Sequence, residues 1–393
     1  MIYNFDEIID RRGSDCLKYD FAKERGKSDD LLPMWIADMD FKAAPEISKA
    51  LQKLIDHGVY GYTDTKSDYF EAVYNWFHSR HQYELCEEAL IKAPSIVYAI
   101  AAAVQSFTSK GDAIIIQTPV YYPFYDAILR NDRKLVENPL YIENGKYLID
   151  FDDFEKKIVS ENVKMFILCS PHNPVSRVWT KEELLKLGNI CLKHKVLVFS
   201  DEIHCDFVYG DNKHFVFSSL SKEFEDNTIL ATSASKSFSL AGLHNCNIFI
   251  KNKELKRLYQ STIEKAGYSQ PNMMGIAATK AAYKSGGAWF DDLLVYLNEN
   301  ITFMREFIQK NMPKIHMIEP EGTYLIWVDM RELGLDDAKR DEFIEKKAKL
   351  WLNKGSIFGK ASRGFERFNI ACPKATLKEA MERLKKAYDE LES

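Results

Sequence analysis

The sequence is poor in the residues that mark unusual protein classes. It has 18 glycines and 12 prolines in 393 residues, which is below average usage and excludes collagen-like and low-complexity disordered chains. It also lacks a strong charge of one sign, because 53 Lys+Arg against 58 Asp+Glu give a net charge of -5. Nucleic-acid-binding proteins normally carry a basic balance or patch, so the charge argues against that class. The hydrophobic fraction of 46% and the chain length are typical of a globular protein with a large core.

Long hydrophobic runs and paired cysteines are also missing. The longest apolar run covers residues 96–104 and is about half as long as a membrane span. Residues 1–15 are too charged for a signal peptide. The cysteines are odd in number and show no C-x-x-C spacing, so neither a disulfide framework nor a structural zinc site is indicated. We therefore expect a cytoplasmic protein with reduced cysteines, no metal and no membrane partner; the seven are Cys16, Cys86, Cys169, Cys191, Cys205, Cys246 and Cys372.

Four short apolar runs recur through the middle of the chain. Each is almost continuously apolar rather than alternating, which is typical of strands buried on both faces. Helical patterns separate the runs, and a capping box from Thr180 to Glu183 opens one of these helices. Strands that alternate with helices predict a mostly parallel sheet covered by helices. The four predicted strands cover residues 112–117, 164–169, 195–200 and 228–232.

The two ends of the chain predict a second unit. An amphipathic helix is predicted near residues 47–55, a long helix from 287 to about 311 and a strand over 324–328. A second capping box, from Thr376 to Glu379, predicts the start of a closing helix. We therefore predict an α/β protein with a large domain over residues 46–285 and a smaller α+β domain built from residues 1–45 and 286–393.

Reactive side chains follow each predicted strand, at the point where the strand ends. Each of the four runs is followed by one such residue, and in chain order these are Tyr121, Asn173, Asp201 and Lys236. In open α/β sheets, ligands bind at the carboxyl ends of the strands, so these four residues are expected in one crevice. A lysine for a Schiff base, a carboxylate for a pyridine nitrogen, a donor for a ring oxygen and an aromatic face are the groups that pyridoxal 5′-phosphate requires.

Seven motifs, in this order and spacing, resemble the fold-type-I pyridoxal-phosphate enzymes of aminotransferase class I/II. Within them, the chain is most similar to the branch that contains cystathionine β-lyases, cystalysin-type carbon–sulfur lyases and the maltose-regulon modulator proteins. The resemblance covers nearly the whole chain and implies a transferase-like fold with the cofactor in the large domain. The motifs lie at 33–41 (PMWIADMDF), 57–62 (HGVYGY), 118–121 (TPVY), 169–174 (CSPHNP), 200–204 (SDEIH), 233–237 (SASKS) and 367–373 (RFNIACP).

The resemblance gives each strand-end residue a role, although each also has a simpler interpretation. It implies that Lys236 forms the Schiff base, that Asp201 holds the pyridinium, that Asn173 bonds the ring oxygen and that Tyr121 stacks on the ring. Alone, these could be a loop lysine, a helix N-cap, a turn asparagine and a core aromatic. His204 either orients the ring or Asp201, or is an ordinary core histidine.

The cofactor phosphate is expected at the start of a helix. The backbone N–H groups of Ile96 and Val97 and the helix dipole would receive the anion. Ser233 and Ser235 can add hydroxyl donors. The resemblance also implies that Tyr62 reaches the phosphate from a second subunit, which would make the protein a homodimer with shared active sites.

On the substrate side, the resemblance implies that Arg367 holds the α-carboxylate, since a planar guanidinium fork suits a carboxylate. Trp35 and Tyr122 are further expected substrate contacts, with core packing as the alternative for Tyr122. The chain departs from the family pattern at two positions. His244 stands where classical aminotransferases have an arginine, which leaves the phosphate charge in question, and Ser176 stands where a glycine usually follows Asn-Pro-x.

The favoured function is a carbon–sulfur β-lyase that converts cystathionine, cysteine or a related S-conjugate to pyruvate, ammonia and a thiol. Lys236 would remove the α-proton, and Tyr121 or Tyr122 would assist the departing thiolate. An aminotransferase acting on a small amino acid would use the same residues and is the main alternative. A regulatory binding protein on the same scaffold is the third hypothesis, since relatives in this branch contact a transcription regulator.

Overall fold

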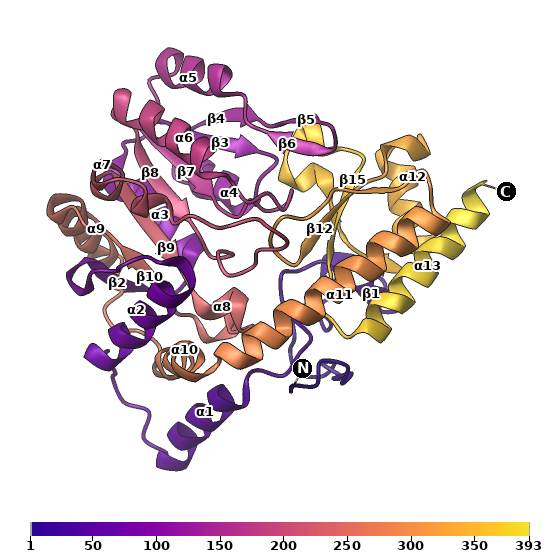
Figure 1. The fold of residues 1–393 in the computed structure, drawn as a ribbon, viewed down its shortest axis with the longest axis horizontal. Helices are drawn as coiled ribbons and strands as arrows, with labels where there is room; N and C mark the ends of the chain where they lie inside the picture. The colour runs from indigo at the N-terminus through magenta and orange to yellow at the C-terminus, as the bar shows by residue number, and fades with distance from the viewer. Residues whose placement is uncertain (1, 393) are drawn as a thin grey trace.

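The computed structural model describes residues 2–392. A seven-stranded sheet lies in its larger part, on the left of Figure 1. Six strands run in one direction, and β10 is antiparallel to both of its neighbours. In spatial order the strands are β2 (Leu90–Ala93), β10 (Cys246–Phe249), β9 (Thr228–Thr232), β8 (Leu197–Asp201), β7 (Met165–Cys169), β3 (Ala113–Thr118) and β4 (Lys134–Pro139).

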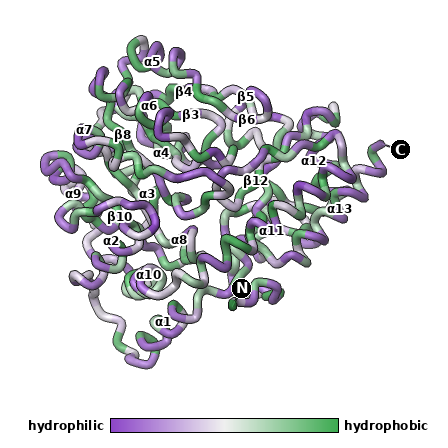
Figure 2. The backbone as a smooth tube through the Cα atoms, viewed as in Figure 1, coloured by the Kyte–Doolittle hydropathy of each residue, from purple (hydrophilic) through white to green (hydrophobic). Residues whose placement is uncertain are grey.

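Helices cover both faces of this sheet. On β3, Ile114 and Ile116 pack in one core, whereas Ile115 between them packs in the other. This alternation follows from the pleat, which turns successive side chains to opposite faces. Figure 2 accordingly shows hydrophobic backbone colour along the central strands. One face packs on α3 (Ile96–Phe107), α4 (Pro123–Leu129) and α9 (Lys253–Lys265), and the other on α5 (Phe151–Ser160), α6 (Lys181–Lys193) and α7 (Lys222–Asp226).

The predicted strands and the first capping box are confirmed. Each of the four central strands lies within two residues of its predicted bounds. At the start of α6, the Thr180 hydroxyl accepts from the Glu183 N–H at 3.1 Å, and the Glu183 carboxylate accepts from the Thr180 N–H at 2.8 Å. The continuous apolar runs therefore identified strands with helices on both faces.

A four-stranded antiparallel sheet forms in the C-terminal part of the chain. Its order is β11 (His316–Met317), β12 (Leu325–Asp329), β15 (Phe365–Asn369) and β14 (Asn353–Lys354). Two long helices, α11 (Gly287–Asn311) and α13 (Lys374–Glu392), run side by side next to it (Figure 1). This confirms the predicted long helix and the strand near 324–328.

The second capping box is wrong. Helix α13 begins at Lys374, so Thr376 lies inside the first turn and is not the N-cap. The N–H groups of Thr376 and Leu377 already donate to the carbonyl of Pro373. The helix starts at the proline because that carbonyl accepts the first bonds of the helix.

The N-terminal segment packs against the C-terminal part of the chain. Strand β1 (Leu32–Pro33) pairs with β13 (Leu350–Trp351), and the Asn369 N–H donates to the Met34 carbonyl at 2.8 Å. These contacts support the proposed smaller domain from both termini. The remaining elements are α1 (Pro45–His57), α2 (Ser67–His81), β5 (Tyr141–Glu143), β6 (Lys146–Leu148), α8 (Ala234–Ser237), α10 (Met273–Ser285) and α12 (Asp337–Asp341). Over residues 2–392, none of the helices has the length and apolar character of a membrane span.

Candidate active site

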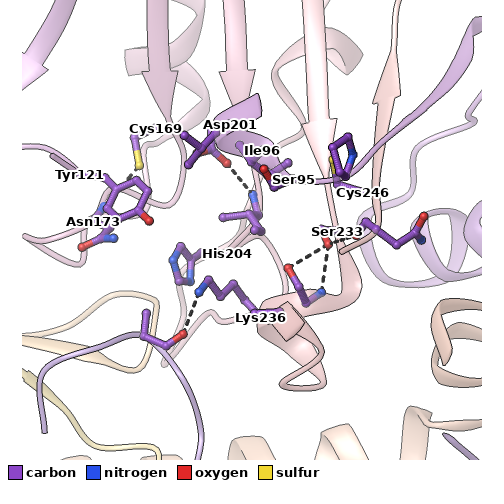
Figure 3. A pocket seen from close by; sticks show the side chains of 17 residues that line it. Ser95, Ile96, Tyr121, Cys169, Asn173, Asp201, His204, Ser233, Lys236 and Cys246 are labelled. Atoms are coloured by element: carbon purple, nitrogen blue, oxygen red, sulfur yellow. Dashed lines mark hydrogen bonds between the residues drawn. The ribbon is translucent and has the colours of Figure 1, made fainter. Parts of the chain in front are cut away.

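A cavity opens at the carboxyl ends of β7, β8 and β9 (Figure 3). The pairing register places Cys169 opposite Asp201 and Asp201 opposite Ala231, so the three strands end at the same level. The loops that follow therefore deliver their side chains to one place. Seventeen residues line the cavity, and the predicted ones among them are Ile96, Val97, Tyr121, Asn173, Asp201, His204, Ser233, Ser235 and Lys236.

Lys236 lies on the short helix α8 with its amine at the cavity. Its Nζ donates a hydrogen bond to the carbonyl of Ala37 at 2.7 Å (Figure 3). Burial lowers the pKa of this amine to about 8, although the charges of Asp38 and Asp201 partly offset the effect. Near pH 7–8 the amine is therefore neutral far more often than an ordinary lysine amine, and the neutral form is the nucleophile.

Asp201 is the last residue of β8 and is buried beneath the cavity. Burial raises the pKa of its carboxyl to about 7, while a hydrogen bond from the Ile203 N–H at 3.1 Å lowers it. This carboxylate caps a turn rather than a helix. A buried carboxylate needs a cationic or donor partner, and a protonated ring nitrogen in the cavity would supply one.

Arg367 and Asn173 are joined directly. The Arg367 guanidinium donates to Asn173 Oδ1 at 2.8 Å, to the Trp35 carbonyl at 2.9 Å and to Asn353 Oδ1 at 2.5 Å. The amide nitrogen of Asn173 remains available as a donor at the cavity. Arg367 is 2% exposed, and within residues 2–392 it pairs with no carboxylate. Burial lowers its pKa to about 10. It lies behind Asn173 rather than in the cavity wall.

Tyr121 and His204 also face the cavity. Burial raises the pKa of the Tyr121 phenol, so the hydroxyl keeps its proton at neutral pH. Burial, with the charges of Lys236 and Arg367, lowers the pKa of His204 well below its usual value, so this imidazole is neutral. His204 Nδ1 is buried and has no hydrogen-bond partner within the described residues.

The part of the cavity that is formed by the start of α3 and by Ser233 and Ser235 is rich in hydrogen-bond donors. Ser95 caps α3 by accepting from the Tyr98 N–H at 3.2 Å, which leaves the N–H groups of Ile96 and Val97 in the open first turn. The Ser233 hydroxyl donates to the Asn245 carbonyl at 2.8 Å, with the Ser235 hydroxyl 2.9 Å away.

His244 is exposed and is absent from the cavity wall, so Lys236 is the one cationic side chain among the wall residues. His244 therefore does not take the place of the family's arginine in the cavity wall. An anion at this end would depend on backbone N–H groups, hydroxyls and the dipole of α3.

Besides Arg367, three predicted site residues lie outside the cavity wall. The Trp35 ring stacks on Trp351 at 4.6 Å between ring centroids. This side chain was expected to contact the substrate, but it packs against another ring instead. Tyr122 packs on Tyr121 and is 37% exposed. Tyr62 is 96% exposed on the segment between α1 and α2.

Sequence reasoning missed several wall residues, among them Ala37, Ile203, Asn245 and Cys246. Ala37 lies in the 33–41 motif, but its part is played by a backbone carbonyl, which no side-chain pattern reveals. At the second departure, Ser176 adopts φ +57°, a left-handed conformation that favours glycine. Its hydroxyl donates to the Leu325 carbonyl, and this buried hydrogen bond compensates for part of the strain.

The groups in this cavity match pyridoxal 5′-phosphate one by one. A lysine amine with a lowered pKa, a buried carboxylate without a salt-bridge partner among residues 2–392 and the open N-terminus of α3 all line the cavity. The free amide nitrogen of Asn173 suits the ring oxygen, and the Tyr121 ring offers a stacking face. The residues present therefore fit this cofactor.

The fold and this set of groups define a pyridoxal-phosphate-dependent enzyme of the aminotransferase class I and II family. The model of that family matches residues 30–384, and the chain belongs to it. Cystathionine beta-lyase PatB of Bacillus subtilis (strain 168) is 40% identical, with 98% of this chain and 99% of PatB covered. Protein MalY of Escherichia coli (strain K12) is 33% identical, with 97% of each chain covered. The crystal structure of cystalysin from Treponema denticola, which contains pyridoxal 5′-phosphate, has a TM-score of 0.96 at 38% identity and covers all of both chains.

These matches confirm the family, the fold and the cofactor expected from the sequence.

Proposed function

We propose that this protein is a carbon–sulfur β-lyase that converts cystathionine or an S-substituted cysteine to pyruvate, ammonia and a thiol. The observation that carries the proposal is the 40% identity, along 98% of this chain, to a protein named cystathionine beta-lyase. When bound, pyridoxal 5′-phosphate supplies an electron sink for the pair left behind when the α-proton departs.

The residues of the cavity divide between the parts of the cofactor. Lys236 would bind its aldehyde carbon, and Asp201 would hold the ring nitrogen. Asn173 would donate its amide N–H to the ring oxygen, and Tyr121 would cover a face of the ring. His204 would pack beside the ring as a neutral imidazole. The phosphate would take hydrogen bonds from the first turn of α3, from Ser235 and, once its proton turns away from the Asn245 carbonyl, from Ser233.

Arg367 would hold the substrate carboxylate. Its acceptors in the protein are all neutral, so a carboxylate would be its first charged partner. The amine of Lys236 would take the α-proton, since its lowered pKa makes it a base near neutral pH. The C–S bond would then break and the thiolate would leave with the electron pair. Tyr121, which stays protonated, can donate a proton to that sulfur.

We further propose a homodimer in the cytoplasm. Three large side chains between α1 and α2, Val59, Tyr60 and Tyr62, are 60–96% exposed, which is unusual for apolar surface unless a partner covers it. Tyr62 would then reach the phosphate of the neighbouring subunit. The seven cysteines are all free, in keeping with a reducing compartment.

The decisive experiment measures pyruvate from cystathionine in the absence of any keto acid. We expect steady pyruvate release together with a yellow protein whose absorbance near 400 nm disappears on borohydride reduction, with the adduct on Lys236 by mass spectrometry. A colourless protein that takes up no added cofactor would contradict the proposal.

An aminotransferase is the second candidate, favoured by the family to which the chain belongs. It would move the amino group of a sulfur-free amino acid to a keto acid. If that transfer is faster than pyruvate release by tenfold or more, a difference of about 1.4 kcal/mol in barrier, the aminotransferase assignment replaces the lyase.

A further inference from the structure

A buried carboxylate that does not line the cavity contacts α8, the helix that carries Lys236. Asp206 follows β8 by five residues, and its side chain is 2% exposed. Its Oδ1 accepts from the Trp76 indole N–H at 3.0 Å and contacts His81 Nε2 at 2.8 Å. Its Oδ2 accepts the hydroxyl proton of Ser237. Both oxygens are therefore engaged.

Asp206 is ionised in this setting. Burial alone would raise its pKa, but the hydrogen bond and charge of His81 and the hydrogen bonds from Ser237 and Trp76 lower the pKa below its usual value. A hydrogen bond to an ionised acceptor is about twice as strong as one between neutral groups. The Ser237 hydroxyl is thus held by a strong, fixed acceptor.

The elements that hold Asp206 are rigid. His81 and Trp76 belong to the fifteen-residue helix α2, and the Trp76 ring packs against Phe238 at 5.4 Å between centroids. The His81 ring lies edge-on to His214 at 5.5 Å. Asp206 is therefore held in place relative to α2, and so is any group that its second oxygen binds.

That group is the neighbour of Lys236. Helix α8 has four residues, too few to fix its own geometry, and Ser237 is its last residue. A side-chain anchor at Ser237 holds the backbone that carries Lys236, while the Ala37 carbonyl holds the Lys236 amine at the other end.

A metal ion is the other interpretation of this cluster. Ligand atoms of His81, Cys205 and Asp206 lie within 4.8 Å of one another. However, the carboxylate already accepts from two N–H or O–H donors and contacts the imidazole. A metal would have to displace the Trp76 and Ser237 donors, which would leave buried polar groups unpaired.

We propose that Asp206, acting through the Ser237 hydroxyl, is a positioning residue that sets the place of Lys236 in the cavity. The proposal rests on the assignment of Lys236 as the cofactor lysine. Without the anchor, α8 would shift, and the Lys236 amine would meet the cofactor and the substrate α-carbon less often in reactive geometry.

The test uses Ser237→Ala, Asp206→Asn and the double variant, with Thr228→Val as the matched control. Thr228 is buried at the opposite end of β9, and its hydroxyl donates to the Phe224 carbonyl at 2.6 Å. Ser237→Ala and Thr228→Val each remove one buried hydroxyl hydrogen bond, and Ser237→Ala should lose more thermal stability because its acceptor is ionised whereas that of Thr228 is a neutral carbonyl.

Three readouts separate positioning from stability. For Ser237→Ala and Asp206→Asn, we expect pyridoxal 5′-phosphate to bind cofactor-free protein at least tenfold more weakly. We also expect kcat to fall about tenfold with the KM for cystathionine within twofold. The pH profile of Lys236 labelling by an amine reagent should shift. Thr228→Val should change none of these, and the double variant should match the worse single variant, because both act through one contact.

Equal cofactor affinity and equal labelling profiles in Ser237→Ala and Thr228→Val would overturn the proposal, as would additive losses in the double variant. Loss of bound metal from the wild-type protein on chelation, with the same kinetic change as in Asp206→Asn, would also overturn it. If Asp206→Asn does not fold, Ser237→Ala alone decides. Failure of the proposed function would be seen separately, as wild-type protein in which borohydride fixes no cofactor on Lys236.

Discussion

The two sheets contribute to the active site in different ways. The seven-stranded sheet supplies its groups from loops after consecutive strands, and parallel pairing alone makes those strand ends level. The four-stranded sheet supplies Arg367 from the middle of β15, between register partners Trp327 and Asn353. Three acceptors from three separate segments then hold the guanidinium.

Substitutions in the two regions should therefore affect function in different ways. Residues at the parallel strand ends face the cavity because of topology, so their substitution should change chemistry or cofactor binding. Arg367 reaches the site because of packing, so its neighbourhood should govern substrate binding. The contact between Arg367 and Asn173 is the point where the two regions meet.

The largest effect is expected at the end of β9. Lys236→Ala should lower the rate of pyruvate release by about 10²–10⁴-fold, the range supplied by a positioned proton-transfer group. The same substitution at the exposed Lys222 should leave the rate unchanged. If the Lys236→Ala protein kept more than a tenth of wild-type activity, this lysine would not be the group that transfers the α-proton.

The next effect is a pH-dependent change in stability at the end of β8. In cofactor-free protein, the Asp201 pKa of about 7 lies above its unfolded value of about 4, so its contribution is favourable at low pH and is lost as pH rises through 7. Asp201→Asn should therefore stabilise the cofactor-free protein by about 2–4 kcal/mol at pH 8.5, with the gain vanishing near pH 4.

Denaturant unfolding at several pH values would measure the difference for Asp201→Asn. The exposed Asp211→Asn serves as the control and should show no such pH dependence. A gain that is the same at pH 8.5 and pH 5, or a loss at pH 8.5, would contradict the predicted burial effect.

A smaller effect is expected from the four-stranded sheet. Arg367→Lys should weaken amino-acid binding by about 10- to 150-fold, since a charge-assisted pair contributes roughly 1.5–3 kcal/mol and lysine lacks the planar fork. The exposed Arg363→Lys, four residues earlier, should have no effect. Spectroscopic titration with a slow substrate analogue would measure the affinity, and unchanged binding would show that another group holds the carboxylate.

The smallest effect on catalysis is expected at Trp35. Trp35→Phe should lose about 1–2 kcal/mol of stability, because the ring stacks on Trp351 and its indole N–H donates to the Lys18 carbonyl. The KM for cystathionine should stay within twofold. A large change in KM with unchanged stability would show that the Trp35 side chain contacts the substrate after all.

The sequence by itself determined the class of the fold and the groups of the large sheet. Continuous apolar runs require cover on both faces, and residues that directly follow parallel strands converge whatever the rest of the chain does. Tyr121, Asn173, Asp201 and Lys236 could therefore be assigned to one crevice from their places in the chain.

Tertiary structure decided everything that depends on contacts between distant segments. The Ala37 carbonyl bonded to Lys236 is a backbone group, and the Trp35 ring turns to Trp351 although its carbonyl holds Arg367. Asp206 and Ser237 are 31 residues apart, and no periodic pattern links them. Such contacts arise when packing brings separate loops together, and only there does an ordinary polar residue acquire a partner and a fixed direction.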